Sequence, residues 1–436
     1  MFENKTLFII PVVCFVCIYV SYLRFRQLIN PAALMTLWWG GWLFVSNLGI
    51  AGFYVPGWHI QTLVLIMLIT YTLGTFFYDI PRKNITTLDA VVFCKKHILD
   101  KLYFLAFVCI TPYFIKSLTI IALLPGTYRS AVFQLEEEDN VLFGNPYISI
   151  FFFKFLFPFL FLLTIISVIY FYVFNNKQYF FFTVLLTVMK SIMLSARTDI
   201  YYILFLILLS ESFVRDKYVQ LSQKEIKTRK NILIFLTSLF VITIILLSVF
   251  RLDPNGSSNI DVLEDVYSQF IQYHTQGFHL MSSELSNNSS FSSETITYGR
   301  ATLGGLEDLF LTFIRRFGIN YDTLSKVIGE YQIYNGTEIA PGRYIAIYYT
   351  MLFQFYLDGK ELFVCLASGT LGCLTSYFYL DWSINRSLNS LFRLMLLLST
   401  SLLSIFQFQM GVSFWMVLLY FALLTNINKK SSKLTV

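Results

Sequence analysis

Three arginines are the residues whose type and surroundings point most directly to chemistry. Arg197 stands between two apolar runs, Arg300 lies in a long polar segment, and Arg343 follows a proline–glycine pair. An arginine next to apolar sequence is costly unless it meets water or an anionic partner. Its planar guanidinium matches the oxygens of phosphate groups. We therefore expect these three side chains to bind a phosphate or a diphosphate.

Simpler interpretations of the same arginines stay open. Arg197 could form a local ion pair with Asp199 at the membrane surface. Arg343 could lie with its apolar stem along lipid and its charge in water, and Arg300 could do the same. One arginine alone would therefore indicate little. Three on the same side of a membrane favour an anionic ligand.

Proton transfer would need a base, and three residues are candidates. His274 and His279 lie five residues apart in the polar segment, and Asp358 follows a short apolar run. Histidine and carboxylate side chains are the usual general bases. Asp358 could instead cap a helix that begins near Glu361. The histidines have no obvious third ligand, so no metal is expected. There is also no glycine-rich phosphate loop, so no cofactor is expected.

Composition identifies the elements that must position these residues. The chain has 436 residues, of which 56% are hydrophobic and 13% charged, and its mean hydropathy is +0.64. Soluble domains carry about 25% charged residues. Runs of about 20 apolar residues, enough to span a membrane, recur throughout. We predict an all-α polytopic membrane protein with about 11 transmembrane helices (10 to 12), at 6–23, 31–52, 60–79, 102–123, 147–173, 179–195, 199–214, 232–250, 361–380, 389–407 and 411–427.

Positive charge in the short connections sets the predicted orientation. Lys and Arg gather at 24–26, 82–101, 215–230 and 429–433, which places these stretches in the cytoplasm. The polar segment Arg251–Gly342 is then external. The segment 344–357 covers only about 21 Å as a helix, short of the roughly 30 Å hydrocarbon core, so we expect it to lie on the surface or to re-enter. This divides the chain into an N-terminal bundle of about eight helices (1–250), a large periplasmic loop (251–342) and a C-terminal part (343–436).

The predicted external loop has its own organisation. Helical spacing appears at Asp261–Phe278 and Leu303–Ile333. In the second stretch an apolar stripe predicts an amphipathic helix on the membrane surface; it consists of Leu306, Leu309, Phe310, Phe313 and Phe317. The stretch Ser282–Thr297 is rich in Ser and Asn, which is typical of a surface link.

Two short motifs resemble a known family. Ser195-Ala196-Arg197-Thr198-Asp199, at the start of an apolar run, is similar to the Ser-Arg-Thr signature of bacterial O-antigen and oligosaccharide repeat-unit polymerases of the Wzy type. The stretch from Gly342-Arg343-Tyr344 to Asp358-Gly359 and Gly369 resembles that family's segment after its large periplasmic loop. Here Asp358 is followed directly by Gly359, without an intervening aromatic residue.

The resemblance implies a function, a place and partners. Such an enzyme is a glycosyltransferase of lipopolysaccharide biosynthesis with a GT-C-like architecture in the bacterial inner membrane. It joins undecaprenyl-pyrophosphate-linked repeat units at the periplasmic face. Its partners would be the lipid-linked glycan donor and acceptor and membrane lipid, with room for a chain-length regulator and no nucleic acid. Two alternatives stay open, a lipid-linked oligosaccharide flippase and an O-antigen ligase.

Overall fold

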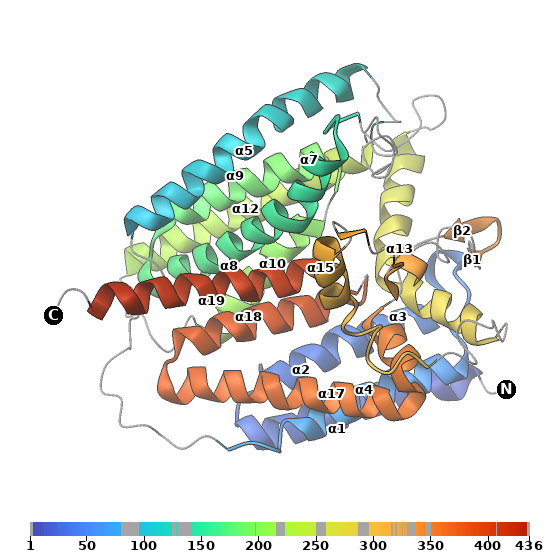
Figure 1. The fold of residues 1–436 in the computed structure, drawn as a ribbon. Coiled ribbons are helices and arrows are strands. Elements are labelled where there is room, and N and C mark those ends of the chain that lie inside the picture. Colours follow the sequence, from blue (N-terminus) through green and yellow to red (C-terminus); the bar gives the residue numbers. More distant parts are fainter. Residues whose placement is uncertain are drawn as a thin grey trace. The chain divides into compact units, whose positions relative to one another are not determined.

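The computed structural model describes residues 3–79, 96–123, 128, 141–196, 198–214, 223–249, 259–286, 296–314, 317–318, 321–324, 326–328, 337–345, 350–406 and 408–433 (Figure 1). These residues are mostly helical. The chain forms two compact units, Met1–Val91 with Ser268–Trp415, and Val92–Tyr267 with Met416–Val436. Each unit joins stretches that are distant along the chain, and the three-part division expected from the sequence stays a prediction.

The first unit holds the N-terminal helices and most of the polar residues of interest. Its elements are α1 Glu3–Phe25, α2 Pro31–Met35, the π-helical η1 Thr36–Gly40, α3 Gly41–Asn47, the 3-10 helix η2 Ile50–Gly52, α4 Trp58–Gly74, α15 Gly304–Ile314, β1 Thr337–Ala340, β2 Arg343–Ile345, α17 Met351–Asn385 and α18 Leu388–Leu403. Most of α13 Asn259–Ser286 also belongs here, as does the start of α19 Val412–Lys433.

The second unit is built from long apolar helices. They are α5 Lys96–Leu123, α7 Pro146–Phe151, the π-helical η3 Phe152–Leu156, α8 Phe157–Phe174, α9 Lys177–Met193, α10 Thr198–Phe213 and α12 Gln223–Val249. Side-chain amides cap α7 and α9 at their first turns, where Asn145 and Asn176 accept backbone N–H groups.

Within the described residues, four helices are long and apolar enough to cross a membrane: Leu7–Phe25, Lys96–Leu123, Pro146–Phe174 and Met351–Asn385. Three shorter apolar helices accompany them, Trp58–Gly74, Leu388–Leu403 and Val412–Thr425. The predicted class, a helical membrane protein, agrees with this. Each of the eleven expected runs falls on helical structure, while the number that cross a bilayer stays a prediction.

Helices α4 and α17 lie side by side in the first unit and run parallel (Figure 1). Hydrogen bonds join Tyr71 to Thr375 at 2.7 Å and the Ser376 hydroxyl to the Thr75 carbonyl at 3.0 Å. The helices approach so closely that a Cβ on Gly372 would lie 2.0 Å from the Tyr71 carbonyl oxygen. Small residues permit such contact between apolar helices. Parallel packing is what the predicted orientation requires, because both runs are expected to enter from the external side.

Helix α17 is interrupted near its start. Gly359 and Lys360 have non-helical backbone angles, which separates a first part, Met351–Asp358, from a second part that begins at Glu361. Every residue of the first part is buried. The expectation that 344–357 lies on the membrane surface or re-enters stays a prediction, and residues 346–349 of that segment lie outside the described ranges.

The long polar segment contains more order than its composition indicates. The helix expected at Asp261–Phe278 forms and extends to Asn259–Ser286, while the expected Leu303–Ile333 helix forms over Gly304–Ile314. A short two-stranded antiparallel sheet, β1 with β2, accompanies the helices, and the described residues remain consistent with the predicted all-α class. Its turn is made by Pro341 and Gly342, whose φ of +71° suits glycine.

Candidate functional site

The carboxylate of Asp358 fixes the loop that carries Arg300. It accepts hydrogen bonds from the Thr297 hydroxyl at 2.5 Å and from the backbone N–H groups of Gly299, Ala301 and Thr302 at 2.9, 2.9 and 2.8 Å. The side chain is buried, with 2% of its surface exposed. The expected helix-capping role is thus replaced by a longer-range one. Four donors on two oxygens favour a structural role over proton transfer.

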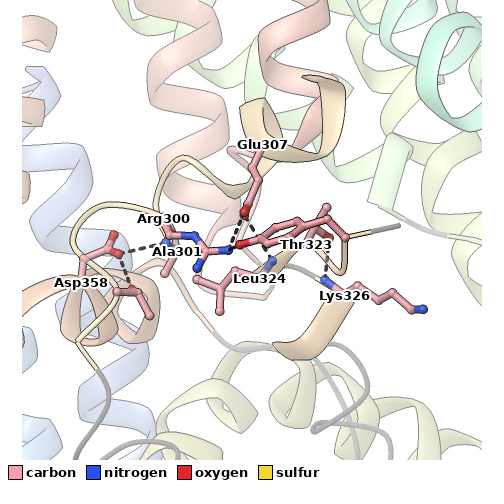
Figure 2. Close-up of polar contacts among 9 residues, drawn as sticks. Arg300, Ala301, Glu307, Thr323, Leu324, Lys326 and Asp358 are labelled. Carbon is pink, nitrogen blue, oxygen red and sulfur yellow. Dashed lines mark hydrogen bonds and ion pairs between the residues drawn. The ribbon is translucent and has the colours of Figure 1, made fainter. Parts of the chain in front are cut away.

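Arg300 lies on this anchored loop with its guanidinium half exposed (Figure 2). It forms an ion pair with Glu307 of α15 at 2.6 Å and donates a hydrogen bond to the Tyr321 hydroxyl. Hydrogen bonding to Glu307 raises the pKa of Arg300, so the group stays charged. Among the described residues, both of its hydrogen bonds use Nη2. The guanidinium is also half exposed, so an anion can approach it from solvent.

Glu307 ties the same loop to a further segment. Its second oxygen accepts the backbone N–H of Leu324 at 3.2 Å, and the adjacent Thr323 hydroxyl accepts the N–H of Lys326 at 3.1 Å (Figure 2). The loop at 297–302, helix α15 and residues 321–328 are therefore linked through one carboxylate. Such shared contacts hold a guanidinium in a defined position before a ligand arrives.

The two histidines of α13 lie in apolar surroundings. His274 stacks on Trp42 with ring centroids 3.8 Å apart, and its Nδ1 lies 2.7 Å from the Phe270 carbonyl oxygen. His279 is 5% exposed, and its Nε2 has no hydrogen-bond partner among the described residues. Burial lowers the pKa of each to about 4. These environments favour packing, since a buried ring does not reach a polar substrate.

The other two predicted arginines are not placed by the structure. Arg197 lies outside the described residues, and for Arg343 the backbone is described, in β2, but not the side chain. Asp199, the alternative partner of Arg197, forms an ion pair with Lys190 at 2.7 Å. That pair borders a cavity of about 20 Å³ in the second unit, which has room for roughly one water molecule. The three arginines are therefore not shown to gather at one site.

A polar cluster that the sequence analysis did not single out lies at the interruption of α17. His59, at the start of α4, has its Nε2 3.1 Å from a carboxylate oxygen of Glu361. The Lys360 ammonium lies 4.9 Å from the ring centroid of Tyr356. His59 and Glu361 are 302 residues apart, so no local pattern predicts the pair. The predicted orientation did place His59 and Glu361 on the same side of the membrane, because each begins a span that follows an external connection.

The loop that carries Arg300 and this cluster belong to the same unit and meet at the same interruption. Asp358 anchors the loop and stands two residues before Lys360. Charged groups here can bind an anion, and the histidine–carboxylate pair can move a proton. Within the described ranges, no group of three His, Cys, Asp or Glu residues could hold a metal ion.

Comparisons with known proteins do not identify a relative. No protein-family model, no curated protein and no solved structure matches the chain.

Proposed function

We propose that the protein is an oligosaccharide repeat-unit polymerase of the bacterial inner membrane. It transfers a glycan from its undecaprenyl-pyrophosphate carrier to a second lipid-linked unit at the periplasmic face. One observation carries the proposal: a charged, half-exposed Arg300 sits on a loop that Asp358 fixes to the interruption of a long apolar helix. The motifs of the sequence analysis agree with it.

The chemistry requires stabilisation of a leaving diphosphate. As the bond to the sugar breaks, negative charge grows on the diphosphate, and a positioned guanidinium stabilises it more in the transition state than in the ground state. Arg300 has N–H donors at Nη1 and Nε for which the described part of the chain shows no partner, and its carboxylate partner Glu307 is only 19% exposed and holds it in place. In this proposal Arg197 and Arg343 supply further positive charge.

The loop also suits a lipid-linked substrate. Large apolar side chains are exposed on this loop, on α15 and shortly after α15: Tyr298 at 86%, Phe310 at 64% and Phe317 at 83%. Exposed aromatic residues next to charged groups are typical of surfaces at the lipid headgroup level. A polyprenyl carrier embedded in the bilayer would present its diphosphate at this level.

Two related functions make different demands. A ligase would use the same donor but a different acceptor. A flippase would need a polar route through its spans. The partly buried Lys190–Asp199 pair borders space for about one water. Neither alternative gains a specific observation over polymerisation.

Analysis of the surface glycan from a deletion strain tests the proposal. Complementation with the wild-type chain should restore a ladder of long products, and Arg300→Gln should leave single repeat units on lipid A core. Loss of one such donor costs about 10²–10³-fold in rate. Lys326→Gln is the matched control, since Lys326 pairs with Asp322 on the surface. Long chains with Arg300→Gln would refute the role of Arg300. Carrier-linked polymer that accumulates in the deletion strain would indicate a ligase, and single units trapped on the inner leaflet would indicate a flippase.

A further inference from the structure

His59 and Glu361 form a histidine–carboxylate pair open to solvent. The Nε2–Oε1 distance is 3.1 Å, and the two side chains are 48% and 51% exposed. They stand at the first turns of α4 and of the second part of α17. The packing of these parallel helices sets the positions of both residues. The pair is therefore a built feature of the first unit and not a contact between two mobile loops.

Two further groups stand beside this pair. The ring of Tyr356 lies edge-on to His59 with centroids 6.0 Å apart. The Lys360 ammonium lies over the same tyrosine ring. The backbone of Lys360, with φ 56° and ψ −147°, adopts a conformation that side chains rarely take. The interruption of α17 thus places a cation, an imidazole and a carboxylate around one aromatic ring.

A carboxylate that accepts the Nε2–H of a histidine holds the ring in one tautomer. The other nitrogen, Nδ1, then carries the lone pair and can accept a proton. Among the described residues, none of the three bases predicted from the sequence has an accessible nitrogen or oxygen of this kind. His274 and His279 are buried, and the oxygens of Asp358 already accept four hydrogen bonds.

We propose that His59 is the general base of the transfer reaction, that Glu361 positions it, and that Lys360 faces the departing diphosphate. This inference rests on the proposed function and names the residues that would perform its proton transfer. Asp358 brings Arg300 and Lys360 to the same part of the chain. It accepts hydrogen bonds from the loop that carries Arg300, and it stands two residues before Lys360.

Nδ1 of His59 removes the proton from the acceptor sugar hydroxyl while its oxygen bonds to the anomeric carbon of the donor. The bond between that carbon and the diphosphate oxygen breaks, and its electron pair stays with the diphosphate. Lys360 and Arg300 offset the charge. The proton on His59 then passes to water, and no oxidant or metal is needed.

The test is a rate measurement on the full-length protein in lipid vesicles, with undecaprenyl-pyrophosphate-linked repeat units from the native host as substrate. His59→Ala and His59→Gln should lower kcat by about 10²–10⁴-fold with little change in KM. Glutamine retains an N–H donor for Glu361 but cannot act as the base. Glu361→Gln should lower kcat by about 10–100-fold. Added imidazole should restore part of the rate to His59→Ala only.

His97→Ala is the control, since His97 is an exposed histidine on α5 in the other unit. Wild-type rates in both His59 variants would overturn this inference and leave the polymerase proposal standing. The inference would also be overturned if the His59 variants lost activity that imidazole does not restore and had a lower melting temperature, because the role of His59 would then be structural. If the wild-type protein forms no polymer from these substrates, the proposed function itself is wrong.

Discussion

Removal of the Asp358 carboxylate should release the loop that carries Arg300. The described donors to this side chain are one hydroxyl and three backbone N–H groups, from Thr297, Gly299, Ala301 and Thr302. In Asp358→Ala all four lose their acceptor. In Asp358→Asn the oxygen that receives three of them stays, while an amide NH2 opposes the N–H of Thr302. The two variants therefore differ in a predictable way.

The magnitude follows from the hydrogen bonds. A hydrogen bond to a charged acceptor contributes about 1.5 kcal/mol or more. Water can replace the acceptor for the part-buried Gly299 and Thr302 but not for the buried Ala301. We expect Asp358→Ala to lower the free energy of unfolding of this region by about 4 kcal/mol and Asp358→Asn by about 2 kcal/mol.

Hydrogen–deuterium exchange of the peptide that contains Gly299 to Thr302 is the suitable assay, because it reports local opening even where the rest of the unit stays folded. A loss of 4 kcal/mol corresponds to exchange faster by roughly 10³-fold. Asp322→Ala is the control, since Asp322 is 66% exposed and forms a surface ion pair with Lys326. Unchanged exchange in Asp358→Ala would show that these hydrogen bonds do not hold the loop.

Three further predictions concern packing, charge and pH. Gly372→Ala should destabilise the protein by several kcal/mol, because the new Cβ would lie 2.0 Å from the Tyr71 carbonyl oxygen. Gly41→Ala is the control: a Cβ there would have no atom within 4 Å, so this variant should be neutral or slightly stabilising in thermal melts. Lys190→Met should cost about 1–3 kcal/mol, since it removes the 2.7 Å ion pair of a partly buried Asp199, and the double variant with Asp199→Leu should recover part of it. Burial lowers the pKa of His279 from 6.5 to about 4, so the folded state disfavours the charged ring. The free energy of unfolding is therefore highest above pH 6.5, where the ring is neutral in both states, and it falls by roughly 3 kcal/mol as the pH drops toward 4. Chemical unfolding of His279→Leu at pH 7.5 and 4.5 should show a smaller difference than the wild type.

The sequence predicted the positions of the helices well and the polar contacts between distant residues poorly. Long apolar runs such as 102–123 and 147–173 coincide with helices because hydrophobicity over about 20 residues is a local property. The turn at Pro341 and Gly342 was predictable for a similar reason, since proline and glycine restrict or extend the backbone on their own. The interruption at Gly359 and Lys360 was visible only as a short apolar segment.

The polar contacts of the candidate site depend on tertiary packing. The sequence suggested two roles for Asp358, a general base or a cap of the helix that begins near Glu361, but its hydrogen-bond donors lie 56 to 61 residues earlier in the chain. The sequence did not predict the contact between His59 and Glu361, because the two residues are 302 positions apart. A single sequence carries no record of such distances. The charge pattern did indicate that positive and titratable groups lie next to the ends of apolar segments, as Arg300 and Lys360 do.

The two-part composition of the first unit has a consequence for biosynthesis. Helix α4 is synthesised early, while its parallel partner α17 follows only after the whole stretch Val92–Tyr267 and more. At about 5–20 residues per second, the ribosome needs on the order of 10–35 seconds for that stretch alone. During this interval the tightly fitting face of α4 around Tyr71 and Gly74 has no α17 to cover it. Assembly of this unit is thus delayed until late in translation, and a chain truncated before Met351 would leave α4 permanently without its partner.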